Sequence, residues 1–200
     1  ISPGLFVPAF EENGYISQMD LYVEKTARAF MERRYQSSRK VVPVAINLSR
    51  MDFYDNNMMK EVLDDVRNAG ELHPYMRFEV TESAYAVLEE KGNNILNELR
   101  EMGAKILVDD FGSGYSSLNM LKDMPVDILK IDLQFLDSKD KSDRGGNILN
   151  SVVRMAKWLH IPVIAEGVET RQQADFLRTI GCNYVQGYYY SRPVSITAYE

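Results

Sequence analysis

Short apolar stretches alternate with longer amphipathic stretches along this chain. The short stretches are rich in Val, Ile and Leu, a composition that is typical of buried strands. They predict six strands, at residues 41–48, 77–82, 106–110, 127–132, 162–167 and 184–188. The longer stretches carry apolar residues at helical spacing. They predict helices at residues 18–34, 55–68, 95–102, around 118–121, 147–159 and 170–180.

Local signals support several of these boundaries. In the first helix, Leu21, Ala27, Phe30 and Met31 form the apolar pattern. Gly103 is placed as the residue that follows the third helix, where glycine tolerates a left-handed backbone. The last helix begins with the spacing of a capping box, Thr170 followed by Gln173. The polar run 138–146 is expected to be an exposed loop, and residues 1–4 are predicted to lie in the middle of one.

Six strand–helix repeats imply a parallel sheet covered by helices. Each predicted strand is apolar until its carboxyl end, where it carries a polar residue: Asn47, Glu79, Asp109, Lys130, Glu166 and Gln186. In a (β/α)8 barrel these ends form one ring, and the active site is built there. An open doubly wound sheet is the alternative, but it would not gather all six ends around one point. The sequence predicts a single α/β domain, residues 1–200, of the TIM-like (β/α)8 barrel class, lacking its first strands.

Two adjacent carboxylates end the third predicted strand. Asp109 and Asp110 repel each other, so either one takes up a proton or a divalent metal holds both ionised. Neighbouring strand side chains point to opposite faces, so both can serve one site only where the strand is ending. The glycines at 112 and 114 provide that ending. A solvated loop with two exposed acids is the alternative interpretation.

The polar residues at the strand ends suit a hard metal ion. Glu79 and Glu166 stand in apolar stretches, where an acid is uncommon unless it is paired or metal-bound. Carboxylates and one amide favour Mg²⁺ or Mn²⁺ over zinc. Asp109 and Asp110 could bridge two metal ions about 3.5–4 Å apart, an arrangement used for phosphoester hydrolysis. His73 and His160 have no ligand spacing and are expected to be structural or surface residues.

Composition narrows the function classes. Hydrophobic content of 45% and charged content of 26% are ordinary for a soluble globular protein. The net charge of −6 argues against a broad phosphate-binding surface and against nucleic acid as a partner. The single cysteine, Cys182, fits a reducing compartment. No apolar run is long enough to span a membrane and no signal peptide is seen. The absence of G-x-S-x-G speaks against a serine hydrolase.

Six motifs, in order along the chain, resemble the EAL-domain family of cyclic di-GMP phosphodiesterases. They are Val-Ala-Ile-Asn47-Leu-Ser, Phe-Glu79-Val-Thr-Glu82-Ser, Asp109-Asp110-Phe-Gly-Ser-Gly-Tyr-Ser-Ser, Leu-Lys130-Ile-Asp132, Ala-Glu166-Gly-Val-Glu169-Thr and Val-Gln186-Gly-Tyr. The resemblance implies a (β/α)8 barrel with one reversed strand. It also implies metal-dependent hydrolysis of one phosphodiester bond of cyclic di-GMP, giving linear pGpG.

The resemblance further implies a role for each residue at these positions. Asn47, Glu79 and Asp109 would ligate one Mg²⁺ or Mn²⁺ ion, and Asp110 would be shared with a second. Lys130 would hold and polarise the attacking water, while Glu166 would bind metal or a metal-bound water. Gln186 and Asp132 would contact the substrate. Glu82 would order the loop that carries Asp110 and residues 112–115, and Glu169 would support the ring from behind.

The resemblance places the Glu-Ala-Leu motif, whose glutamate is a metal ligand in the family, a little upstream of Ile1. If that glutamate is missing from the protein, metal affinity should fall. A catalytically idle EAL domain, acting as a cyclic di-GMP receptor or partner-binding module, is the alternative hypothesis. We further expect a cytoplasmic homodimer in bacterial signalling, fused to sensor or GGDEF-type domains that could anchor the parent protein in a membrane.

Overall fold

A computed structural model of the chain describes residues 1–88, 90–112, 121, 124–133 and 144–200. Two compact units make up this part of the chain. Of the described residues, unit 1 comprises 1–88, 90–109, 121 and 124–127, and unit 2 comprises 110–112, 128–133 and 144–200. In the described residues no helix is both long and apolar enough to cross a membrane.

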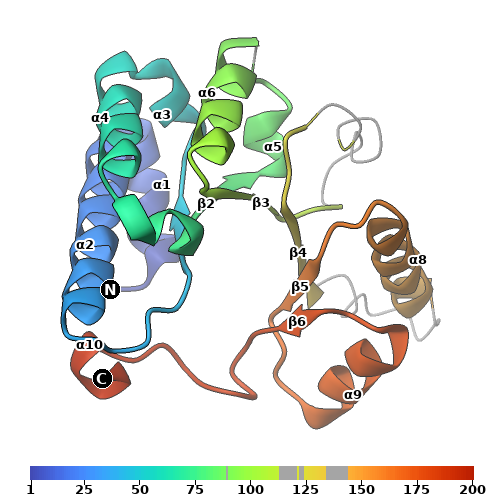
Figure 1. The fold of residues 1–200 in the computed structure, drawn as a ribbon. Helices are drawn as coiled ribbons and strands as arrows, with labels where there is room; N and C mark the ends of the chain where they lie inside the picture. Colours follow the sequence, from blue (N-terminus) through green and yellow to red (C-terminus); the bar gives the residue numbers. More distant parts are fainter. Residues whose placement is uncertain (89, 113–120, 122–123, 134–143) are drawn as a thin grey trace. The chain divides into compact units, whose positions relative to one another are not determined.

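Unit 1 contains three parallel strands and the helices that pack on them. Its elements are α1 (Pro3–Asn13), α2 (Ile16–Gln36), β1 (Val44–Asn47), α3 (Arg50–Tyr54), α4 (Asn56–Arg67), the 3₁₀ helix η1 (Gly70–Tyr75), β2 (Met76–Thr81), α5 (Glu82–Tyr85), α6 (Glu90–Glu101) and β3 (Lys105–Asp109). Helix α2 packs beside α4, α4 beside α6, and α6 against β3 (Figure 1). The central strand β2 pairs with β1 and β3, parallel to both.

Unit 2 also contains three parallel strands with helices packed beside them. Its elements are β4 (Ile128–Asp132), α8 (Arg144–Trp158), β5 (Val163–Glu166), α9 (Arg171–Ile180), β6 (Tyr184–Val185) and α10 (Ile196–Tyr199). Strand β5 pairs in parallel with β4 and with β6, and α8 lies beside α9. The predicted strand–helix repeat and its parallel pairing are therefore confirmed within each unit.

Buried apolar side chains explain the strands. On β2, Met76, Phe78 and Val80 are fully buried. In unit 2, Leu129 and Val163 are also fully buried. Burial of such side chains is the main favourable contribution to folding, at about 25 cal/mol per Å² of apolar surface. The polar residues at the strand ends are held in place by this apolar framework.

Several predicted boundaries are confirmed by their caps. The Thr170 hydroxyl accepts a hydrogen bond from the Gln173 N–H at 3.2 Å, and Gln173 Oε1 accepts one from the Thr170 N–H at 2.9 Å. Gly103 has a positive φ of 101°, and Gly181, which follows α9, has a positive φ of 76°. Glycine reaches this backbone region without the steric cost that a Cβ would bring.

Three sequence predictions were wrong. Residues 3 and 4 belong to α1, not to a loop: Pro3 suits the first position of a helix, where its missing N–H has no partner to lose. The predicted loop 138–146 is wrong from Arg144 on, where α8 begins. The last strand ends at Val185 instead of residue 188, because the chain turns sharply at Gly187. The helix expected around residues 118–121 lies almost wholly outside the described residues.

The buried face of α2 also differs from the prediction. Met31 is buried, but Leu21, Ala27 and Phe30 stay partly exposed. Further along the same face, Asp20 and Glu24 are 5% and 0% exposed. A helix that buries two carboxyl groups does not follow from hydrophobic spacing, which treats every acid as a surface residue.

Burial raises the pKa of Glu24 to about 8, helped by the negative charge of Asp65 and opposed by Arg28. The folded chain therefore holds this proton over a pH range in which the unfolded chain, with a pKa near 4.5, has released it. The resulting stabilisation is complete below the unfolded pKa and is lost as pH rises through about 8.

We predict that Glu24→Gln removes this pH dependence. The free energy of unfolding of the variant, relative to wild type, should increase by about 1–3 kcal/mol between pH 5 and pH 8. Denaturant unfolding at a series of pH values measures it, with Glu12→Gln on the exposed part of α1 as the matched control. If the difference in unfolding free energy between wild type and the variant stays constant with pH, Glu24 is not a buried protonated residue.

Candidate active site at the strand ends

In unit 1 the register of the strands places three oxygen-bearing side chains on one face. Asn47 lies opposite Glu79, and Glu79 lies opposite Leu107. Directly opposed residues of parallel strands point to the same side of a sheet, and so do residues two apart on one strand. Asp109 follows Leu107 by two residues, so it shares the face of Asn47 and Glu79. The predicted grouping of these three residues is thus supported inside unit 1.

Two acids, one in β2 and one directly after it, are buried. Glu79 is 7% exposed, although it stands next to the fully buried Phe78 and Val80. Glu82, 3% exposed, is the first residue of α5, directly after the strand. The Thr81 hydroxyl caps this short helix by accepting a hydrogen bond from the Ala84 N–H at 3.1 Å. The residues 113–115 that Glu82 was predicted to order lie outside the described part of the chain.

The donor set in unit 1 fits a hard divalent cation. One amide oxygen and two carboxylates are ligands that Mg²⁺ and Mn²⁺ prefer. Across the described ranges, no three His, Cys, Asp or Glu side chains lie close enough together to hold a metal ion. The set of Asn47, Glu79 and Asp109 is not such a group, because only Glu79 and Asp109 are acids and the third residue is the amide Asn47.

In unit 2, three predicted residues are in direct contact. Lys130 Nζ lies 2.8 Å from Glu166 Oε1, and Gln186 Nε2 donates a hydrogen bond to the same oxygen at 2.5 Å. Lys130 is 5% exposed, and this carboxylate helps to compensate the charge of its buried ammonium. Oε1 of Glu166 therefore contacts both the ammonium of Lys130 and the amide of Gln186.

Two aspartates join this group through the backbone. The Phe111 N–H donates to the Lys130 carbonyl at 3.1 Å, which fastens the segment of Asp110 beside β4. Asp110 itself has a positive φ of 53°, a left-handed conformation that Asp tolerates better than most residues. Asp132 lies opposite Glu166 in the register. A Cβ added to Gly167 would lie 3.4 Å from Asp132 Oδ1, so this aspartate closely approaches the turn after β5.

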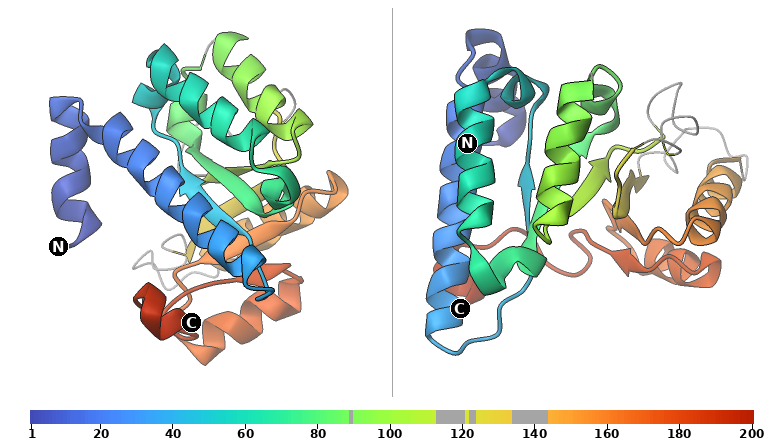
Figure 2. Two further views of the ribbon diagram at one scale, coloured as in Figure 1. Left: turned by 60° about the vertical axis from the view of Figure 1, so that its left-hand side comes forward. Right: turned by 45° about the horizontal axis from the view of Figure 1, so that its top comes forward.

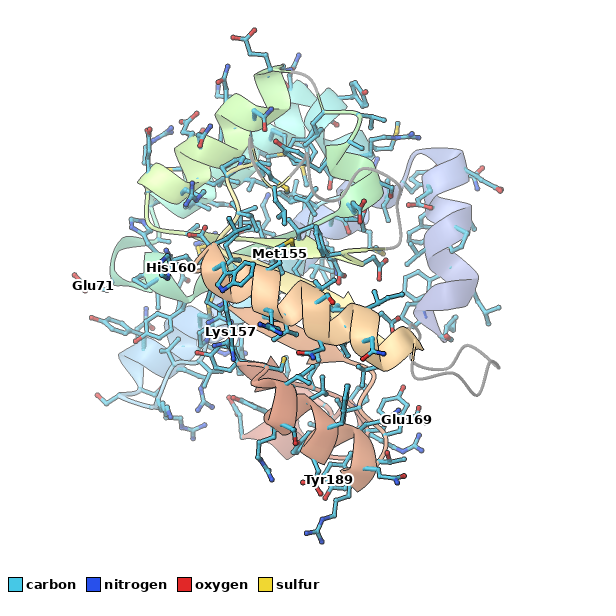
Figure 3. The ribbon with its side chains drawn as sticks, turned by 90° about the vertical axis from the view of Figure 1, so that its right-hand side faces the viewer. Glu71, Met155, Lys157, His160, Glu169 and Tyr189 are labelled. Carbon is cyan, nitrogen blue, oxygen red and sulfur yellow. The ribbon has the colours of Figure 1, made fainter. Side chains whose placement is uncertain are left out.

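An open hollow of about 580 Å³ adjoins Glu166 and Gln186 in unit 2. Glu169, Tyr188 and Arg192 also line it, and the Arg192 guanidinium lies 4.7 Å from the centre of the Tyr188 ring. In Figure 3, Glu169 and Tyr189 lie at the opposite end of unit 2 from His160, which precedes β5. Glu169 is exposed, and its N–H donates to Gln173 Oε1 at 2.8 Å. Sequence reasoning missed Arg192, whose only signal is its place six residues after Gln186.

A family model described as EAL domain matches residues 1–193 of this chain. The chain belongs to the EAL domain family. Cyclic di-GMP phosphodiesterase NbdA of Pseudomonas aeruginosa is 36% identical to this EAL domain over 200 residues, which are 100% of this chain and 26% of NbdA. The chain therefore spans about a quarter of that curated relative's length.

Solved structures agree with this membership. The PaMucR phosphodiesterase in complex with c-di-GMP matches with a TM-score of 0.91 and 32% identity, over 100% of this chain and 81% of that one. The manganese/cy-diGMP complex of BlrP1 of Klebsiella pneumoniae matches with a TM-score of 0.76 and 31% identity, over 89% of this chain and 45% of that one. The predicted TIM-like α/β barrel class of this EAL domain is confirmed.

The turn at Gly187 fixes the backbone next to Gln186, and we predict that Gly187→Ala disrupts it. The Val168 N–H donates to the Gln186 carbonyl at 3.1 Å, and the Tyr189 N–H donates to the Val168 carbonyl at 2.9 Å. A Cβ on Gly187 would lie 2.2 Å from the Val168 oxygen, a backbone atom that cannot move away cheaply. The variant should lose about 2–4 kcal/mol of unfolding free energy, measured by denaturant unfolding.

Gly4→Ala is the matched control for this variant. Gly4 lies in α1, and among the described atoms a Cβ there would approach only Ser2 Oγ, at 3.9 Å. Alanine is also the better helix former, so this change should leave stability unaltered or slightly raised. Equal stability of the two variants would contradict the close approach of Gly187 to Val168.

Proposed function

We propose that this EAL domain hydrolyses one phosphodiester bond of cyclic di-GMP and releases linear pGpG, using two Mg²⁺ or Mn²⁺ ions that would share Asp110 as a ligand. The observation that carries the proposal is the shared face of Asn47, Glu79 and Asp109 in unit 1. The names of NbdA and of the cyclic di-GMP complexes support the choice of substrate.

The residues of unit 1, together with Asp110, are proposed to hold the metal. Asn47, Glu79 and Asp109 would bind one ion, and Asp110 would serve both. When bound, the cation neutralises the phosphate and lowers the pKa of a coordinated water. Binding by carboxylates also removes the repulsion between the adjacent Asp109 and Asp110.

Lys130 and Glu166 are proposed to handle the attacking water. The buried ammonium of Lys130 can orient this water and stabilise negative charge that develops on it. Glu166, 2.8 Å from Lys130 Nζ, would accept a proton or share in metal binding. Asp132 and Gln186 would contact the substrate, while Glu82 and Glu169 would act as positioning residues for the groups that touch it.

The length of the relatives bears on the protein in which this EAL domain functions. Because the chain spans 26% of NbdA, we propose that it functions within a longer protein that carries sensor or GGDEF-type domains. A homodimer and a cytoplasmic site of action remain predictions, supported by the family membership and by the free Cys182.

The test is to incubate the protein that carries this region, including any sequence that naturally precedes Ile1, with cyclic di-GMP. Chromatography should show pGpG in the presence of Mg²⁺ or Mn²⁺ and none with EDTA. Asp109→Asn should lower kcat by about 100-fold or more, because an amide cannot supply the lost negative charge at the metal. Asp64→Asn, at an exposed aspartate of α4, should leave kcat unchanged. Binding without hydrolysis would overturn the proposal in favour of a receptor.

A second prediction concerns Glu82 as a positioning residue. Glu82→Ala should raise the metal concentration needed for half-maximal activity about tenfold or more, with most of kcat recovered at saturating metal. Titration of activity with Mg²⁺ measures this, and Glu82→Gln should rescue part of the loss. A fall in kcat that saturating metal does not restore would contradict a role through metal binding.

A further inference from the structure

The hollow beside Glu166 and Gln186 contains a cation to which the proposed reaction gives no role. Its lining includes Arg192, in the segment that follows β6. Figure 2 draws this segment in red, between β6 and α10. The proposed reaction uses the metal-binding residues together with Lys130 and Glu166. Arg192 therefore needs an explanation of its own.

The side chain of Arg192 keeps its hydrogen-bond donors available. Across the described residues, its guanidinium has one ionic, hydrogen-bonding or ring interaction, with the Tyr188 ring, whose centre lies 4.7 Å away. Such a cation–π contact involves the positive charge and leaves the N–H donors unused. A ligand in the hollow could accept hydrogen bonds from these donors.

The backbone around Arg192 has little freedom. The Gly187 carbonyl accepts hydrogen bonds from the N–H groups of Tyr190 and Ser191, at 3.0 Å and 3.3 Å, which closes a turn. The Ser191 hydroxyl donates to the Arg192 carbonyl at 2.9 Å. The ring of Pro193 disfavours helical backbone at the residue before it, which is Arg192. A side chain presented from such a segment loses less conformational entropy when it binds a ligand.

The charges in the hollow favour a neutral polar group over a second phosphate. Glu166 is compensated by Lys130, whose Nζ lies 2.8 Å from Glu166 Oε1. The other two charged residues of the lining are Glu169 and Arg192, one of each sign. A phosphate beside them would be attracted by one and repelled by the other. A group without net charge avoids this repulsion and can still accept hydrogen bonds from Arg192.

A nucleobase is a group of this kind. The lining offers apolar surface for the faces of a base, on Tyr188, Pro193 and Val194. Tyrosine rings stack on bases of any type, so this surface alone does not select one base. Arginine does, because two of its N–H donors match the neighbouring acceptors O6 and N7 of guanine. Adenine carries an amino donor where guanine has O6, so the same pair of donors cannot be satisfied.

We propose that Arg192, held beside Tyr188, recognises a guanine base of the cyclic dinucleotide by donating hydrogen bonds to O6 and N7. This inference rests on the proposed function, because it takes the cyclic dinucleotide to bind beside Glu166 and Gln186. Arg192 is then a specificity-determining residue, which selects the nucleotide and takes no part in breaking the phosphodiester bond.

The test compares cyclic di-GMP with cyclic di-AMP, which has the same phosphates and different bases. Isothermal titration calorimetry measures both Kd values on the protein that carries this region, including any sequence that naturally precedes Ile1. Ca²⁺, which takes the same kind of oxygen ligands, replaces Mg²⁺, and chromatography afterwards checks that the ligand is intact. The wild type should bind cyclic di-GMP about tenfold more tightly than cyclic di-AMP, or better.

Two variants and one control isolate the contribution of the guanidinium. Arg192→Met, which removes the donors, should weaken cyclic di-GMP binding about tenfold or more and cyclic di-AMP binding by less than about threefold. Arg192→Lys keeps the charge without the planar pair of donors and should lose the same discrimination. Arg154→Met, at an exposed residue of α8, is the matched control and should leave both Kd values within about twofold.

The outcomes separate this inference from the proposed function. Equal losses for the two nucleotides in Arg192→Met would identify a phosphate contact, and wild-type discrimination in Arg192→Lys would show that charge alone suffices. Either result, unchanged binding in Arg192→Met, or a wild type that does not bind cyclic di-GMP would overturn the inference. Formation of pGpG with Mg²⁺ tests the proposed function separately. If the wild type binds with the expected preference without hydrolysis, only the proposed function fails.

Discussion

The in-register pairing of parallel strands is the constraint on which the rest of this structure depends. Because β1 and β2 are aligned so that Asn47 opposes Glu79, an amide and a carboxylate share one face with Asp109 of the next strand. A slip of one residue in any pairing would turn one side chain to the opposite face. The apolar residues between them, such as Phe78, are buried by the helices and therefore fix the register.

The register of β4 and β5 in unit 2 likewise sets the surroundings of a buried charged group. Lys130 is buried in an apolar strand, and its ammonium is compensated by Glu166 on the adjacent strand. Removal of Glu166 would take a compensating negative charge away from the buried ammonium of Lys130, which costs more than the pair contributes. Gln186 donates to the same carboxylate oxygen, so Glu166 is held by one residue of β4 and by one that directly follows β6. A group held this rigidly can act on a substrate with little reorganisation.

How much of this could be read from the sequence depends on the kind of signal. The ends of β1 to β5 and the Thr170 cap were predictable, because apolar runs and capping residues are local patterns. The buried face of α2 was not, since the spacing of Asp20 and Glu24 is the same whether a helix buries or exposes them. Arg192 was missed for a related reason: its contact with Tyr188 depends on the turn at Gly187, which no periodicity describes.

The net charge of the chain does not give the charge around a particular site. A total of −6 argues against a broad phosphate-binding surface, and that inference concerns the average over the chain. A ligand responds to charges within about a Debye length, roughly 8 Å at physiological salt. Within that distance Lys130 Nζ meets Glu166 Oε1 in unit 2, while Glu79 and Asp109 place carboxylates on one face of unit 1. The local charge around a group can therefore differ from the average over the chain, because the fold decides which charged side chains lie within that distance.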